Sequence, residues 1–144
     1  MANVFDVAKY ILRQQGVIST WKLQKLCYYA QAWSLAWTEH ELFSEDFEAW
    51  SNGPVCRELF NEHKGLFTIG YDDLKKGNPE KLTPDEQDTV NVVLREYGYM
   101  SPYELRELSH SENPWKVTRG NLPDGCPSEK VIPKSLIGSF YGGL

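Results

Sequence analysis

The sequence predicts a mainly α fold. We expect a compact single-domain helical fold over residues 1–144, arranged around a central buried helix at about residues 20–37, with at most a small two-stranded β ribbon. Three observations predict it. The central stretch is apolar almost all round on a helical wheel. Helix-start signatures recur at Thr83 and Ser101. Finally, 144 residues can bury one core without disulfides or a metal.

The central helix has no face that suits water. Its residues read TWKLQKLCYYAQAWSLAW, and apolar side chains occupy both sides of the wheel. Exposing either side would leave several large aromatic groups in water, so the helix should run through the middle of the fold. The residues expected to be buried are Leu23, Leu26, Cys27, Ala30 and Trp37.

Composition excludes several functional classes. The net charge of −5 disfavours a phosphate backbone, and therefore nucleic acid, as the main partner and favours a protein partner. No apolar run reaches membrane-spanning length and no secretion signal opens the chain, so we expect a cytoplasmic protein without membrane contact. Cys27, Cys56 and Cys126 lack CxxC spacing, which predicts free thiols.

Local signals define the helix that precedes the central one. Asn3 is a good N-cap with Asp6 three residues later, and Gly16 follows the last residue with helical spacing. This pattern predicts a helix between Asn3 and Gly16. Its apolar residues should pack on the central helix.

The segment after the central helix predicts a strand, a turn and a helix. Residues 43–50 hold apolar side chains with acidic residues between them and should be extended, and residues 52–54 then break the strand. Pro54 is placed to be the first residue of a new helix, which Gly65 should end.

The middle of the chain predicts a long connection followed by two capped helices. Residues 66–82 show no clean periodicity, so we expect a surface connection with a short helical turn near Asp73. A helix should then begin after Thr83 and end at Gly98, because Thr-Pro-Asp-Glu combines an N-cap, a first-turn proline and a capping glutamate. The same device at Ser101 predicts a helix that ends near His110.

Proline and glycine dominate the C-terminal third. Pro114 disfavours helical geometry at the residue before it, so no helix should continue through this point, and an irregular crossing should start at Gly120. Residues 131–132 could add a short strand beside residues 47–50. A last helix should begin at Pro133.

No pattern in the sequence favours a cofactor, a metal site or catalysis. Cys56 and His63 would lie about 10 Å apart along one helix, too far to bind one ion without other ligands. No nucleophile elbow, HExxH or glycine-rich phosphate loop is present. His110 is either a helix-end histidine that favours the helix dipole and bonds to local backbone, or a ligand-binding residue.

A helix-turn-helix DNA-binding regulator is the alternative function. The first helix, the turn at residues 16–19 and the central helix match its spacing, with Lys22 and Lys25 near the start of the would-be recognition helix. A recognition helix needs an exposed polar face, however, and the aromatic content of this one opposes such exposure.

Two tryptophans stand beside proline-containing turns rather than on helical stripes. Trp50 and Trp115 are either loop residues that cap the core or exposed anchors of a protein interface. The sequence alone leaves both interpretations open.

An ordered set of motifs resembles the Panacea antitoxin domain, the SocA-like family of bacterial and phage toxin-antitoxin systems. The motifs are KLQKLCYYAQAW (residues 22–33), FEAWSNGPV (47–55), LTPDE (82–86), LSHSENPW (108–115) and the closing residues 137–141. The set spans nearly the whole chain. Asn52 departs from the pattern, because an aromatic residue is common there in the family.

The resemblance implies a mainly helical domain that neutralises a cognate protein toxin, often by direct binding, and we expect that toxin to be encoded adjacently. The absence of catalytic motifs predicts that the domain is not an enzyme. Some members of the family are adaptors that deliver the toxin to a protease. We expect partner-binding residues around the two tryptophans, and nothing in the sequence sets the oligomeric state. The expected partner-binding residues are Trp50, Asn52, Gly53, Pro54, His110, Glu112, Pro114 and Trp115.

Overall fold

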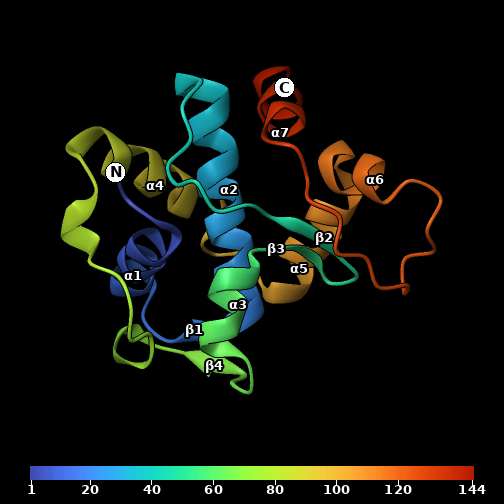
Figure 1. The fold of residues 1–144 in the computed structure, drawn as a ribbon. Coiled ribbons are helices and arrows are strands. Elements are labelled where there is room, and N and C mark those ends of the chain that lie inside the picture. Colours follow the sequence, from blue (N-terminus) through green and yellow to red (C-terminus); the bar gives the residue numbers. More distant parts are fainter.

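Helix α2 (Thr20–Thr38) lies at the centre of the fold, as the sequence predicts. The structure, a computed structural model, describes residues 1–144. In Figure 1, α2 stands between α1 and α4 on one side and α5, α6 and α7 on the other. The other helices are α1 (Val4–Gln15), α3 (Arg57–His63), α4 (Pro84–Tyr97), α5 (Pro102–Ser111), α6 (Asn113–Arg119) and α7 (Lys134–Gly142).

Three helices start at the capping signals seen in the sequence. At the starts of α1, α4 and α5, the side chain of the N-cap residue (Asn3, Thr83 or Ser101) accepts a hydrogen bond from the backbone N–H three residues later. The acidic side chain at that later position accepts in return from the backbone N–H of the N-cap residue, which completes a capping box. These boxes satisfy backbone N–H groups that a helix start otherwise leaves without partners. The predicted starts are therefore confirmed.

The hydrophobic core surrounds α2. Of the five residues of this helix that were predicted to be buried, one is exposed. Thirty buried apolar residues form one cluster, and Leu23, Leu26, Cys27 and Ala30 are inaccessible to solvent within it. Trp37 was expected there but is 51% exposed. The prediction is wrong at this residue because nothing closes over the groove between the end of α2 and α4, which the indole of Trp37 lines.

Two small antiparallel ribbons complete the fold. Strand β2 (Glu48–Trp50) pairs with β3 (Gly53–Val55). Val131 forms an isolated bridge with Glu48, which confirms the expected pairing beside this segment. The sequence did not indicate the second ribbon, in which β1 (Ile18–Ser19) pairs with β4 (Thr68–Ile69).

Helix α3 begins later than predicted. Pro54 was expected to start it, but Pro54 lies in β3 opposite Ala49, and the helix begins at Arg57. The side chain of Gln24 binds the intervening residue, accepting from the N–H of Cys56 at 2.9 Å and donating to its carbonyl at 3.1 Å. Pairing within the ribbon and this contact from α2 hold the backbone extended for three more residues.

Proline residues lie at helix boundaries in the C-terminal third of the chain. Helix α5 ends at Ser111, before Pro114, as predicted. Helix α6, which the sequence did not indicate, begins at Asn113, so the expectation that the residue before Pro114 is not helical is wrong. Pro133 caps α7. The connection 66–82 holds two short 3-10 turns, Tyr71–Asp73 and Pro79–Lys81, of which the first was expected. None of the helices combines the length and the hydrophobicity required to span a bilayer.

Candidate partner-binding surface

Trp115 is a core residue. Only 3% of it is exposed, and its indole N–H donates to the carbonyl of Trp50 at 2.8 Å. The ring of His110 stacks on it with centroids 3.8 Å apart, and the Arg119 guanidinium lies 4.8 Å from its centroid. Of the two interpretations, the core-capping one is therefore correct for Trp115, and the exposed-anchor one is wrong. The buried Trp115 indole instead holds the backbone of Trp50 in place through this hydrogen bond.

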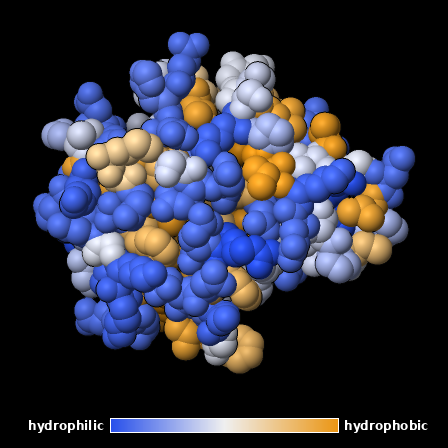
Figure 2. Space-filling model, viewed as in Figure 1, coloured by the Kyte–Doolittle hydropathy of each residue, from blue (hydrophilic) through white to orange (hydrophobic).

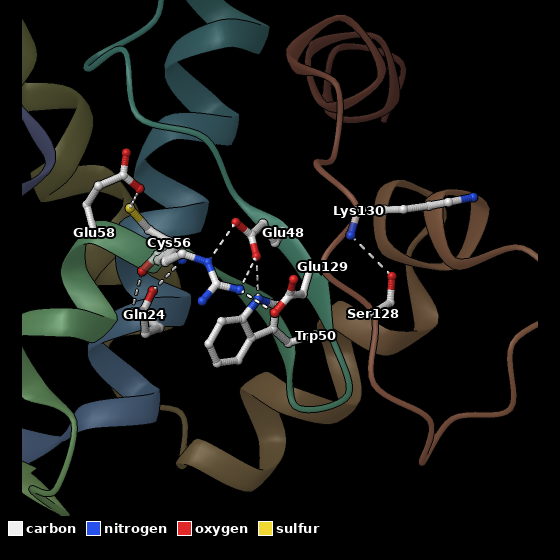
Figure 3. A network of polar contacts seen from close by, with 9 residues as sticks. Gln24, Glu48, Trp50, Cys56, Glu58, Ser128, Glu129 and Lys130 are labelled. Carbon is white, nitrogen blue, oxygen red and sulfur yellow. Dashed lines mark hydrogen bonds and ion pairs between the residues drawn. The ribbon is translucent and has the colours of Figure 1, made fainter.

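Trp50 is half-buried and held on several sides (Figure 3). Its indole N–H donates to Glu48 at 2.8 Å, and its ring meets Phe60 edge-on at 4.9 Å. The guanidinium of Arg57 lies 5.1 Å from the ring centroid and forms ion pairs with Glu48 and Glu129. A large aromatic ring that is already fixed loses little conformational entropy on binding a partner.

The turn between β2 and β3 presents one polar side chain to solvent. Asn52 is exposed, whereas Gly53 and Pro54 are buried. Gly53 adopts φ +108°, a backbone conformation that favours glycine. The turn therefore places the Asn52 amide outward, next to Trp50, on a rigid backbone.

His110 is not the dipole-stabilised histidine that its position at a helix end suggested. Burial, together with the positive charges of Arg106 and Lys25, lowers its pKa to about 4, so the ring is neutral at physiological pH. Its Nε2 atom is buried without a hydrogen-bond partner. Stacking on Trp115, rather than the helix dipole, fixes the ring.

Glu112 faces the interior. Its carboxylate accepts hydrogen bonds from the hydroxyl groups of Tyr29 at 2.6 Å and Tyr141 at 2.7 Å, and burial raises its pKa. Pro114 is also buried. The eight expected partner-binding residues thus divide into three groups. Trp50, Asn52 and His110 reach the surface, Gly53, Pro54, Pro114 and Trp115 support them, and Glu112 joins α2 to α7.

The turn also borders a cavity that the sequence reasoning missed, which we name the Lys25 pocket. It has a volume of about 130 Å³ and is lined by Trp21, Lys25, Asn52, Pro102, Tyr103 and Arg106. Lys25 is only 1% exposed, and its ammonium group has no hydrogen-bond partner. The one signal in the sequence was a lysine within a helix that is apolar almost all round.

Burial changes the protonation of Lys25. Desolvation, and secondarily the charge of Arg106, lowers its pKa from 10.5 to about 7. At a pH between these two pKa values, Lys25 is protonated in the unfolded chain but has mostly lost its proton in the folded chain. This group therefore makes the free energy of unfolding rise with pH between 7 and 9, by roughly 1 kcal/mol per pH unit.

Urea denaturation at pH 7, 8 and 9 checks this prediction. Lys25→Met should lose the rise, while Lys116→Met, at an exposed position on α6, should retain it. Equal slopes in the wild type and Lys25→Met would contradict the assigned pKa.

A second surface feature is an apolar groove between α2, α4 and α5. Its volume is about 550 Å³, and its wall includes exposed Trp37 and Tyr99 and half-buried Met100. The sequence reasoning missed it because Trp37 was assigned to the core. Figure 2 shows that the face seen in Figure 1 is mainly hydrophilic, with only small hydrophobic areas.

The geometry of α2 does not suit a recognition helix. Lys25 is buried, and the ammonium group of Lys22 donates to the carbonyl of Gly98 at 2.7 Å. Of the two lysines expected to face DNA, Lys25 is therefore hidden from solvent and Lys22 is hydrogen-bonded within the fold. Nor does any group of three His, Cys, Asp or Glu side chains lie close enough together to hold a metal ion.

Comparison with known proteins gives one match. The family described as Antitoxin SocA-like, Panacea domain, matches residues 23–116, which include all but the first three residues of α2, both strands of the β2–β3 ribbon, α4 and α5. No curated protein and no solved structure matches the chain.

Proposed function

This chain belongs to the SocA-like Panacea antitoxin family, and on that premise we propose that it neutralises a cognate protein toxin by binding it directly. The match covers roughly two thirds of the chain. The observation that supports a binding role best is the rigid, half-exposed indole of Trp50 beside the exposed amide of Asn52. We call this surface, with the rim of His110, the turn face.

The turn face has the properties of an interface anchor. Tryptophan supplies a large contact area, and the Arg57, Phe60 and Glu48 contacts hold it in place before the partner arrives. Trp115 fixes the backbone beneath it. The net charge of −5 further favours approach by a basic toxin.

Substitution of Trp50 tests the proposal. Trp50→Ala should weaken toxin binding by roughly 2 kcal/mol, about thirtyfold, because it removes the anchor. The loss of stability should be smaller than for a core residue, since Trp50 is only half-buried. The measurement is calorimetric titration with the toxin co-purified from the native operon, counting only folded protein.

Trp37→Ala is the matched control, because it removes an exposed tryptophan from the apolar groove and leaves the turn face intact. If Trp37→Ala weakens binding and Trp50→Ala does not, the toxin docks in the groove instead. If neither does, residues 66–82 become the next surface to test.

The mode of neutralisation needs a separate measurement. Sequestration leaves the amount of toxin in the cell unchanged, whereas delivery to a protease lowers it. Following toxin abundance after synthesis stops, with and without the antitoxin, separates a sequestering protein from a proteolytic adaptor.

A further inference from the structure

The fold supplies no partner for the ammonium form of Lys25. Its ammonium group is buried and makes no hydrogen bond, and the nearest aromatic ring, that of Trp21, has its centroid 5.5 Å away. Buried lysines normally have a partner, because desolvating an unpaired ammonium group costs free energy. The unpaired ammonium group therefore destabilises the folded chain. A binding partner that supplies an anionic group is the simplest physical reason for a lysine at this position.

The surroundings of Lys25 add positive charge rather than cancel it. Arg106 lines the same pocket, and its ion pair is with Glu107, a half-exposed neighbour on α5. None of the residues that line the pocket is acidic. A cavity bordered by two cations and no anion favours a negatively charged group.

The turn leaves room for the Lys25 side chain, which borders the pocket. A Cβ atom on Gly53 would lie 2.5 Å from Cε of Lys25 and 3.2 Å from its Nζ, so only a glycine lets the lysine pass beneath the turn. Asn52 adds an exposed amide at the rim that makes no hydrogen bond within the chain and can donate to an anion. The backbone of the turn at Gly53 and the Lys25 side chain of α2 therefore pack closely against each other.

We propose that the Lys25 pocket binds one carboxylate group of the protein partner, carried by an aspartate or glutamate side chain. This inference rests on the proposed function, since the partner is the toxin that docks on the adjoining turn face. Lys25 and Arg106 would each bind carboxylate oxygens, and the burial of Lys25 makes its contact stronger than it would be in water.

The dimensions and the walls of the pocket favour an acidic side chain. About 130 Å³ accommodates a carboxylate with its methylene groups but not a nucleotide. Trp21, Pro102 and Tyr103 supply apolar walls for those methylene groups. The same Asn52 side chain belongs to the pocket and to the turn face, so a partner seated on one reaches the other.

The first experiment uses a small carboxylate and needs no toxin. At constant ionic strength, 100 mM propionate should raise the melting temperature of the wild type by about 3 °C, and uncharged propionamide should not. Lys25→Met should melt about 3 °C higher than the wild type without ligand, because it removes an unpaired buried charge, and should not respond to propionate. Lys116→Met is the control and should respond as the wild type does.

Two results of this experiment would overturn the proposal. One is an equal response of the wild type and Lys25→Met to propionate, which would place the anion elsewhere. The other is stabilisation by inorganic phosphate without any by propionate, which would assign the pocket to a free phosphate group.

The second experiment uses the toxin and separates this inference from the proposed function. We expect Lys25→Met and Arg106→Gln each to weaken toxin binding about tenfold or more. If Trp50→Ala weakens binding and Lys25→Met does not, the turn face is the interface but the carboxylate contact is wrong. If all three variants bind like the wild type, the proposed surface itself is wrong.

Discussion

Replacing Trp115 with alanine is expected to lower the free energy of unfolding by about 3 to 5 kcal/mol. The indole is 3% exposed, stacks on His110 and donates its N–H to the carbonyl of Trp50. Removing it leaves a cavity under the turn face and a buried carbonyl without its donor. Chemical denaturation measures the loss directly.

The same variant also bears on the role of Trp115 in binding. Once unfolded protein is discounted, Trp115→Ala should weaken toxin binding less than Trp50→Ala does, because its indole supports the surface without forming it. A stability close to that of the wild type, combined with a large loss of affinity, would restore Trp115 as an exposed anchor and contradict the buried geometry.

Replacing Leu26 with alanine is expected to cost about 2 to 5 kcal/mol of stability. Leu26 is fully buried in the middle of α2, and closely packed cores relax only partly around a deleted side chain. Urea denaturation of Leu26→Ala should therefore show a midpoint well below that of the wild type. Leu66→Ala makes the same chemical change at an exposed position and should cost less than about 1 kcal/mol. A loss below roughly half a kcal/mol for Leu26→Ala would mean that α2 is not the centre of the core.

Local sequence signals predicted the parts of the fold that depend on neighbouring residues. The starts of α1, α4 and α5 follow from capping boxes within four residues of chain, so no distant contact is needed to place them. The burial of α2 follows from its all-round apolar surface, because water disfavours every orientation of that helix. The motifs that these elements carry were also enough to indicate the family.

Predictions failed where a distant segment decides the outcome. Pro54 looks like a helix start, but the partner strand and Gln24 keep it extended. Trp37 has helical spacing like that of its buried neighbours, yet no element closes over it. Both predictions used only neighbouring residues in the sequence. Such patterns do not show which distant elements pack against a residue in the fold.

Periodicity, caps and motifs are properties of adjacent residues, so they were enough to indicate a helical domain of the antitoxin family around one buried helix. Which residues could meet a partner depends instead on the tertiary structure. It buried Trp115, turned Glu112 toward two tyrosines and left Trp50 half-exposed. It also placed Lys25 unpaired beneath Gly53 and beside Arg106, three residues from separate elements. Electrostatic and packing energies depend on distances in space, and the fold alone sets those distances.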